Sequence, residues 1–235
     1  MAGRAPSSGG PVDHAVLEDF AAASRILADQ GVFDAAGHVT MRHPGHPERF
    51  LMSRSLAPAL VTPSDILELT LDGESCDPQG RAPFIERHLH AGVYRARPDV
   101  KAVVHAHPKW STFLTMTGHG YLPVYAQGSL VWPMPVLDSP NSINNKAMAD
   151  RLAATLADRP AAMMKSHGAV TVGKTIVEAF VLANYLEENA YRQYMALQIG
   201  KPYSFTREEV AACREKLWTE VLFKRTWDHF RAKLA

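Results

Sequence analysis

The sequence predicts an α/β domain in which helices cover both faces of a mostly antiparallel sheet, giving three layers in the order α/β/α. Segments with helical spacing of apolar residues are mixed with short β-branched runs, without the regular βαβ rhythm of a parallel sheet. The 235 residues are 46% apolar, which is enough for one full core. We therefore expect a single domain over residues 12–235, preceded by a disordered Gly/Ser/Pro-rich lead-in over 1–11.

The first half of the chain contains two predicted helices and four predicted strands. Apolar residues at helical spacing predict a helix over 12–31, which Gly31 ends. A second helix is expected over 84–97, since Pro98 stops it. Alternating or β-branched segments predict the strands 37–42, 50–53, 64–73 and 100–106.

The second half is predicted to be mainly helical. A short helix is expected over 109–116, and amphipathic helices over 145–156 and 176–199 flank a strand over 162–172. A last helix is expected over 206–234.

Histidines at the ends of apolar runs are the main chemical signal. His105 and His107 lie two apart on the strand that Pro108 stops, so their imidazoles share one face. His167 follows another apolar run, and Glu86 begins the helix that leads into the histidine strand. Three histidines and a carboxylate suit one divalent ion, Zn²⁺ or Mn²⁺.

Composition excludes several classes of partner. The formal net charge of +1 gives no electrostatic reason to bind nucleic acid or an anionic membrane. No window has the eighteen apolar residues of a membrane-spanning helix. Cys76 and Cys213 lie far apart and imply no disulfide framework, which fits a reducing cytoplasm.

Four motifs at these spacings resemble the class II aldolase/adducin family over about residues 12–217. They are Gly37-His-Val-Thr-Met-Arg42, the helix from Glu86 with its Arg-Pro-Asp-Val100 end, His105-Ala-His107, and Ser166-His167-Gly168. The resemblance implies one metal ion per subunit and no organic cofactor. It also implies a fourfold-symmetric tetramer with active sites between neighbouring subunits.

The resemblance also implies roles for individual residues. In fuculose-phosphate-aldolase-like members, the positions matching His105, His107 and His167 hold zinc. The position matching Glu86 is the acid/base and can also touch the metal.

Two departures from the sugar-phosphate aldolases point to a different substrate. Those enzymes carry an Asn where this chain has His38, and two hydroxyl residues where it has Phe84 and Ile85. An apolar pair offers a phosphate no side-chain donor. The chain is thus similar to the decarboxylase branch, which acts on hydroxylated aromatic dicarboxylates. Our first choice is 3-hydroxy-2-methylpyridine-4,5-dicarboxylate from vitamin B6 breakdown, followed by a dihydroxyphthalate.

We assign Glu86 as the proton donor to the ring carbon, with Phe84 packing against the ring. His38 is expected to donate to a substrate carboxylate or relay a proton, or equally to cap or pair across a turn. His90 shares the helix face of Glu86 and is expected to support the site.

Three further residues are candidates for binding the substrate carboxylate. Arg42 suits a carboxylate geometrically, although arginines are more often surface or subunit contacts. Ser53 and Arg54 follow a strand, and the alternative for both is an exposed turn. Two other functions stay open: a metal-dependent aldolase acting on a sugar phosphate or related aldol, and a non-catalytic adducin-like interaction module.

Overall fold

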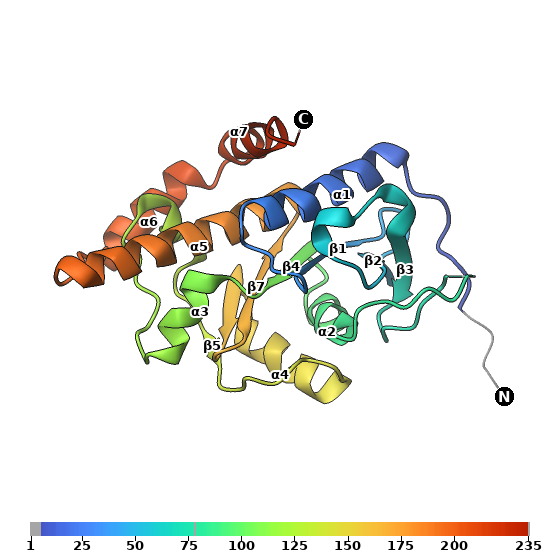
Figure 1. Cartoon of the computed structure of the whole chain (residues 1–235), viewed down its shortest axis with the longest axis horizontal. Coiled ribbons are helices and arrows are strands. Elements are labelled where there is room, and N and C mark those ends of the chain that lie inside the picture. The colour runs from blue at the N-terminus through green and yellow to red at the C-terminus, as the bar shows by residue number, and fades with distance from the viewer. Residues whose placement is uncertain (1–5, 78, 235) are drawn as a thin grey trace.

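The computed structural model describes residues 6–77 and 79–234 (Figure 1). Its α-helices are α1 (His14–Asp29), α2 (Arg87–Ala96), α3 (Lys109–Met116), α4 (Lys146–Leu156), α5 (Ile176–Ile199), α6 (Arg207–Leu217) and α7 (Glu220–Arg231). Its strands are β1 (His38–Arg42), β2 (Arg49–Ser53), β3 (Ile66–Thr70), β4 (Ala102–Ala106), β5 (Val136–Leu137), β6 (Ala161–Met164) and β7 (Gly168–Gly173). Short 3₁₀ turns occupy Pro58–Leu60, Pro63–Asp65 and Ala126–Val131.

The strands form one sheet in the order β3-β2-β1-β4-β7-β6-β5. Every neighbouring pair is antiparallel except β5 with β6, which confirms the predicted mostly antiparallel sheet. The register of β1 on β4 sets His38 opposite His105, and that of β4 on β7 sets Ala106 opposite Ala169. Pairing thus brings the start of β1, the end of β4 and the start of β7 together in the middle of the sheet.

Two cores lie on the two faces of the sheet and confirm the three layers. One core joins α1, α5 and α7 to the side chains of Val39, Leu51 and Val104. The other joins α2 and α4 to Met52 and Val103. In Figure 1, α1, α5 and α7 lie above the sheet and α2 and α4 below it.

The predicted strand over 162–172 is wrong in one respect, because it is a hairpin of two strands, β6 and β7. The chain reverses at residues 165–167, where Ser166 takes a positive φ of 52°. The run is apolar on both sides of the turn because both strands are buried, and three polar residues at 165–167 with no common turn dipeptide are the one sign of the break.

The predicted last helix over 206–234 is likewise two helices. Thr219 begins α7, because its side chain accepts a hydrogen bond from the N–H of Leu222. Trp218, between the helices, packs against the first core and positions this break.

Of the predicted lead-in, residues 1–5 lie outside the described residues. Residues 6–11 form neither helix nor strand, but Ser8 and Gly9 both donate to the carboxylate of Glu68. Among the described residues, no helix is both long and apolar enough to cross a membrane. Cys76 and Cys213 are free cysteines.

Candidate metal centre

Glu86 occupies the start of α2 and faces the histidine end of β4. It is the N-cap residue of the helix and is 6% exposed. Its Oε1 accepts a hydrogen bond from the N–H of Ile143 at 2.9 Å, and its Oε2 lies 3.1 Å from Nε2 of His105. The carboxylate is therefore held from two sides, by the loop before α4 and by the sheet.

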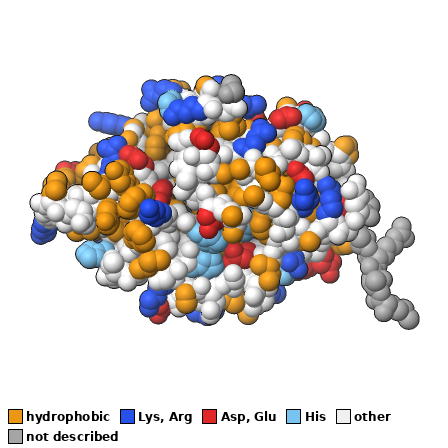
Figure 2. Space-filling view, viewed as in Figure 1, with side chains coloured by type: hydrophobic (Ala, Val, Ile, Leu, Met, Phe, Trp, Pro, Cys, Tyr) orange, Lys and Arg blue, Asp and Glu red, His pale blue; other side chains and the backbone are white. Residues whose placement is uncertain are grey.

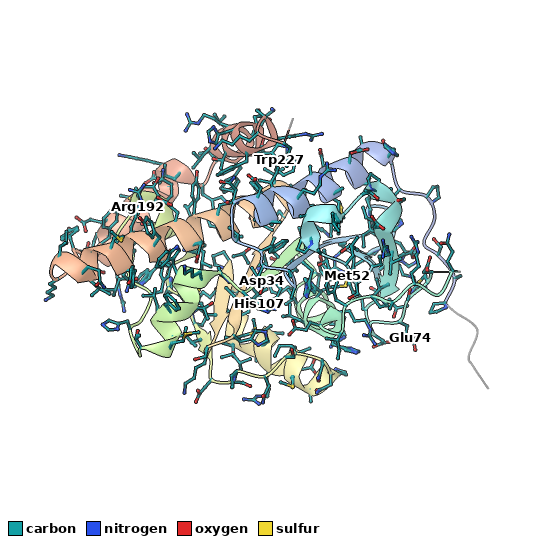
Figure 3. The ribbon with its side chains drawn as sticks, in the orientation of Figure 1. Asp34, Met52, Glu74, His107, Arg192 and Trp227 are labelled. Carbon is teal, nitrogen blue, oxygen red and sulfur yellow. The ribbon has the colours of Figure 1, made fainter. Side chains whose placement is uncertain are left out.

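The sheet and the β6–β7 turn bring three imidazoles to this carboxylate. One ligand atom from each of Glu86, His105, His107 and His167 lies within 4.8 Å of the others. Figure 3 shows His107 with Asp34 near the middle of the molecule, and Figure 2 shows histidine and acidic side chains together near the middle of the same face. The predicted set of metal ligands is thus brought together.

Each of the three imidazoles has its Nδ1 beside an acceptor. His105 Nδ1 lies 3.0 Å from the carbonyl of Ala169, and His167 Nδ1 lies 3.2 Å from that of Asn141. Nδ1 of His107 lies 3.1 Å from a carboxylate oxygen of Asp34. When a cation takes the place of a proton between Nε2 and Glu86, these partners let each ring keep its proton on Nδ1 and turn the lone pair of Nε2 toward the ion.

The resulting lone pairs fit a cation. Nε2 of His105 and Nε2 of His167 point at the carboxylate of Glu86, at 3.1 Å and 3.5 Å. Two acceptors at such distances repel unless a proton or a metal ion lies with them. Three imidazole nitrogens and one carboxylate are a ligand set for Zn²⁺ or Mn²⁺, and ligands oriented through Nδ1 are typical of metal sites. The residues present therefore could hold one divalent ion.

The position of His167 depends on a tight turn. Ser166 has a left-handed backbone, and its N–H donates to the hydroxyl of Thr115 on α3 at 2.9 Å. A Cβ on Gly168 would lie 2.2 Å from the carbonyl of Ala106, so only glycine fits there. The Ser-His-Gly sequence thus lets β7 start close against β4 with His167 aimed at Glu86.

The ionisation of Glu86 is set by its neighbours. Burial alone would raise its pKa, but the imidazoles of His105 and His38 beside it lower the pKa well below the ordinary value. Glu86 is therefore a carboxylate at neutral pH. Burial lowers the pKa of His167, and it lowers the pKa of His38 to about 4, so these rings are neutral there.

His38 is a fourth imidazole at the same place. Its Nε2 lies 3.8 Å from Oε2 of Glu86, and its Nδ1 lies 2.7 Å from Nε2 of His90. Its ring centroid lies 4.6 Å from that of Phe84. The structure thus brings His38, Phe84 and Glu86 together, and it places His90 beside His38 as its helix face predicts.

Arg42 was predicted to bind substrate, but the structure places it elsewhere. Its guanidinium is buried and donates to the carbonyls of Pro47, Tyr94, Arg97 and Val100. Val100 precedes His105 by five residues, so its carbonyl, which accepts from Arg42, lies roughly 17 Å from the histidine end of β4. The correction follows from the strand direction: Arg42 shares a face with His38 but lies at the other end of β1.

The side chains of Ser53 and Arg54, at the end of β2, lie on opposite faces of the sheet. Ser53 shares the face of Leu51, which packs in the α1 core, so alternation turns its hydroxyl away from Glu86. Arg54 lies on the His38 face, and its backbone bridges to Pro83, directly before Phe84. Its Nε donates to Asp65 at 2.6 Å, and its side chain remains 42% exposed. Of the three predicted carboxylate partners, only Arg54 lies on the His38 face next to the segment that carries Phe84.

Sequence reasoning missed the carboxylate of Asp34 and the backbone carbonyl of Asn141. Both lie in loops, and both are defined only by the contact each makes with Nδ1 of a histidine. Burial would raise the pKa of Asp34, but bonds to the N–H of Ala36 and to His107 lower it. A short polar residue in a loop carries no local signal of such a role.

The fold and the site define a class: an α/β/α domain with a candidate metal centre of three histidines and a glutamate at the ends of its central strands. The chain belongs to the class II aldolase and adducin family. The pattern of the Class II Aldolase and Adducin N-terminal domain matches residues 18–194.

The relatives of this chain include proteins named as decarboxylases and aldolases. It is 31% identical to the decarboxylase tropJ of Talaromyces stipitatus, over 78% of this chain and 77% of that protein. It is 30% identical to the 3,4-dihydroxyphthalate decarboxylase of Arthrobacter keyseri, over 74% and 75%. It is 27% identical to the 5-methylthioribulose-1-phosphate/5-deoxyribulose-1-phosphate aldolase of Rhodospirillum rubrum, over 83% and 93%.

The fold is also similar to that of a solved aldolase. The L-fuculose 1-phosphate aldolase of Glaciozyma antarctica superposes with a TM-score of 0.82 at 22% identity, covering 95% of this chain and 93% of that one. At this identity the likeness shows the shared fold alone.

Proposed function

We propose that the protein is a metal-dependent decarboxylase of a hydroxylated aromatic dicarboxylate. The observation that carries this proposal is the lining beside Glu86, where the aromatic ring of Phe84 lies 4.6 Å from that of His38. A planar ring can pack on Phe84, while a phosphate would find no side-chain donor at Phe84 or Ile85. The similarity to a dihydroxyphthalate decarboxylase supports the same substrate class.

His105, His107 and His167 would hold one divalent ion, Zn²⁺ or Mn²⁺, together with Glu86. When bound, such an ion supplies a Lewis acid that stabilises negative charge on a ring oxygen and its neighbouring carboxylate. No organic cofactor is needed for this chemistry.

Glu86 acts in two steps, first as a base and then as an acid. As a carboxylate it has no proton to give, so it first accepts the proton of the ring hydroxyl. It then delivers that proton to the ring carbon that bears the leaving carboxylate. The carbon–carbon bond breaks, its electron pair returns to the ring, and CO₂ leaves. Solvent then protonates the ring oxygen, so one proton is consumed for each CO₂ released.

Arg54 and His38 orient the substrate through its second carboxylate. Both lie on the α2 face of the sheet: the ring of His38 is next to that of Phe84, and the backbone of Arg54 pairs with Pro83, directly before Phe84. Holding the dicarboxylate at two points places its ring carbon near Glu86. A substrate with one carboxylate would lose this second contact.

We propose that the protein is a homotetramer with its active sites between subunits, in a reducing cytoplasm. Ile85, directly before Glu86, is 62% exposed, so an apolar side chain beside the site is left uncovered by its own chain. Exposed apolar side chains also lie on α3 and α5, namely Met116, Tyr191, Met195 and Ile199. Such surface favours burial against another subunit.

The competing function is an aldolase, and the relative from Rhodospirillum rubrum favours it. An adducin-like module without activity has less support, because a binding-only domain has no need to keep four converging ligands. One parallel assay separates the enzymes. Metal-loaded protein is incubated with 3,4-dihydroxyphthalate, 3-hydroxy-2-methylpyridine-4,5-dicarboxylate, fuculose 1-phosphate and 5-deoxyribulose 1-phosphate. We expect CO₂ from an aromatic dicarboxylate; aldehyde from a sugar phosphate without CO₂ would restore the aldolase.

A further inference from the structure

A line of buried hydrogen bonds runs from the candidate metal centre into the space between β1 and α2. Nδ1 of His38 lies 2.7 Å from Nε2 of His90, and Nδ1 of His90 lies 2.7 Å from the hydroxyl of Thr40. That hydroxyl lies 2.9 Å from the hydroxyl of Tyr94. All four side chains are at most 2% exposed. Two ring nitrogens face each other between His38 and His90, so one of them must donate a proton and the other must accept it.

The carboxylate at one end gives this line a direction. Glu86 can only accept, and Nε2 of His38 lies 3.8 Å from it, so an N–H there is attracted and a lone pair is repelled. Nδ1 of His38 then accepts from Nε2–H of His90. Nδ1 of His90 in turn accepts from the hydroxyl of Thr40, which accepts from the hydroxyl of Tyr94. In this order every proton has an acceptor.

The opposite order leaves a group unsatisfied. It would send the proton of Thr40 to the oxygen of Tyr94, whose own proton would then need another acceptor. Among the described residues, Thr40 is the one hydrogen-bond partner of the Tyr94 hydroxyl. The guanidinium of Arg42 lies 4.8 Å from the centre of the Tyr94 ring. The positive charge of Arg42 favours a lone pair of the Tyr94 oxygen on its own side and so turns the hydroxyl proton toward Thr40. The Tyr94 end and the Glu86 end thus both favour donation in the direction of Glu86.

We infer that Thr40 and His90 are positioning residues that hold His38 as the tautomer with its proton on Nε2. This tautomer makes His38 a hydrogen-bond donor to an anionic substrate group rather than a metal ligand. Tyr94 ends the line as the first donor. Three imidazoles of the site thus present lone pairs to a cation, and the fourth presents N–H to an anion. The identity of that anion as a substrate carboxylate rests on the proposed function; the tautomer does not.

The tautomers can be read by long-range ¹H–¹⁵N correlation spectra of protein labelled in histidine, recorded metal-free and with zinc. His38→Asn and the Thr40 variants assign the signals. We expect His38 and His90 to show protonated Nε2 and unprotonated Nδ1 in both states. A proton on Nδ1 of His90 would overturn the inference. This spectrum needs no turnover, so it stands or falls separately from the proposed function.

Substitutions at Thr40 test the consequence for binding. Thr40→Val keeps the shape of the side chain but removes the hydroxyl that donates to His90. We expect His38 to populate both tautomers in this variant. We also expect its KM for the dicarboxylate to rise about tenfold or more. Thr40→Ser should restore both within about twofold. Tyr94→Phe removes the first donor of the line but leaves the Thr40–His90 bond, so it should shift the tautomers less than Thr40→Val does. A Thr40→Val protein with unchanged tautomers and unchanged KM would contradict the inference, and if it fails to fold, the wild-type spectrum decides.

Discussion

The carboxylate of Asp34 lies 3.1 Å from Nδ1 of His107, on the side of the ring away from the other candidate ligands. Asp34 lies in the loop before β1 and His107 follows β4, so the contact joins two segments that are 73 residues apart. It fixes the tautomer that leaves Nε2 of His107 free to bind a cation. The loop before β1 is thereby part of the candidate metal centre.

Replacing Asp34 by Asn should weaken metal binding by about 10–100-fold, because the amide can no longer hold a proton on Nδ1 as a carboxylate does. Zinc affinity measured by competition with a chromophoric chelator checks this. Asp29→Asn, at the exposed end of α1, is the matched control and should bind zinc as the parent does. An unchanged affinity in Asp34→Asn would show that the contact has no role in the site.

Removing a ligand should have a larger effect. His107→Ala takes away one of three nitrogen donors, so we expect at least a tenfold loss of metal affinity and substoichiometric metal in the purified protein. Metal content is measured by mass spectrometry, with His14→Ala, whose side chain is 76% exposed, as the control. Stoichiometric metal in His107→Ala would exclude this residue as a ligand.

Glu86→Gln keeps the shape of the side chain and removes the group that accepts and gives the proton. We expect turnover to fall by roughly 10²–10⁴-fold with substrate binding largely kept. Because Glu86 is also a candidate ligand, metal content must be measured in parallel and saturating metal added to the assay. Turnover within a few-fold of the parent would assign the proton transfer to His38 or to water.

Acid should destabilise the metal-free protein before its carboxylates are protonated. Burial lowers the pKa of His38 from 6.5 to about 4, so between these values the unfolded chain binds a proton that the folded site does not. The free energy of unfolding is unaffected by this group above about pH 6.5. It falls by about 3 kcal/mol as the pH drops toward 4. The lowered pKa of Glu86 acts in the same direction at lower pH.

Urea unfolding of chelator-treated protein at several pH values between 7.5 and 4.5 measures this loss. His38→Asn carries no titrating group and should show a smaller fall in the free energy of unfolding over the same range. Equal falls in the two proteins would contradict the assignment to His38.

The sequence predicted most of the layers and part of the site, for reasons that differ from residue to residue. His105 and His107 could be paired from the two-residue period of a strand, because that geometry is local. Glu86 and His167 depended on the resemblance to a family, since nothing in their own segments fixes how they meet. The hairpin of β6 and β7 was missed because both strands are buried and the three-residue turn between them carries no Pro-Gly or Asn-Gly signal.

The errors concern side chains whose partners come from distant segments. Arg42 lies on the correct strand face, but the carbonyls that bind it belong to residues 47, 94, 97 and 100. Thr40 joins His90 and Tyr94 only because β1 packs on α2. Such contacts are fixed by the packing of the sheet on its helices and leave no periodic trace in the sequence.

Release of labelled CO₂ is the most direct test of the proposed decarboxylase. The zinc- or manganese-loaded protein is incubated with 3,4-dihydroxyphthalate or 3-hydroxy-2-methylpyridine-4,5-dicarboxylate carrying ¹³C in both carboxylates, and the products are followed by ¹³C NMR. We predict one labelled CO₂ or bicarbonate for each substrate consumed, one label retained on the ring, and no release after chelation or in Glu86→Gln. If the metal-loaded protein leaves both labels on the substrate ring and instead cleaves a sugar phosphate rapidly, the proposed decarboxylase activity is contradicted.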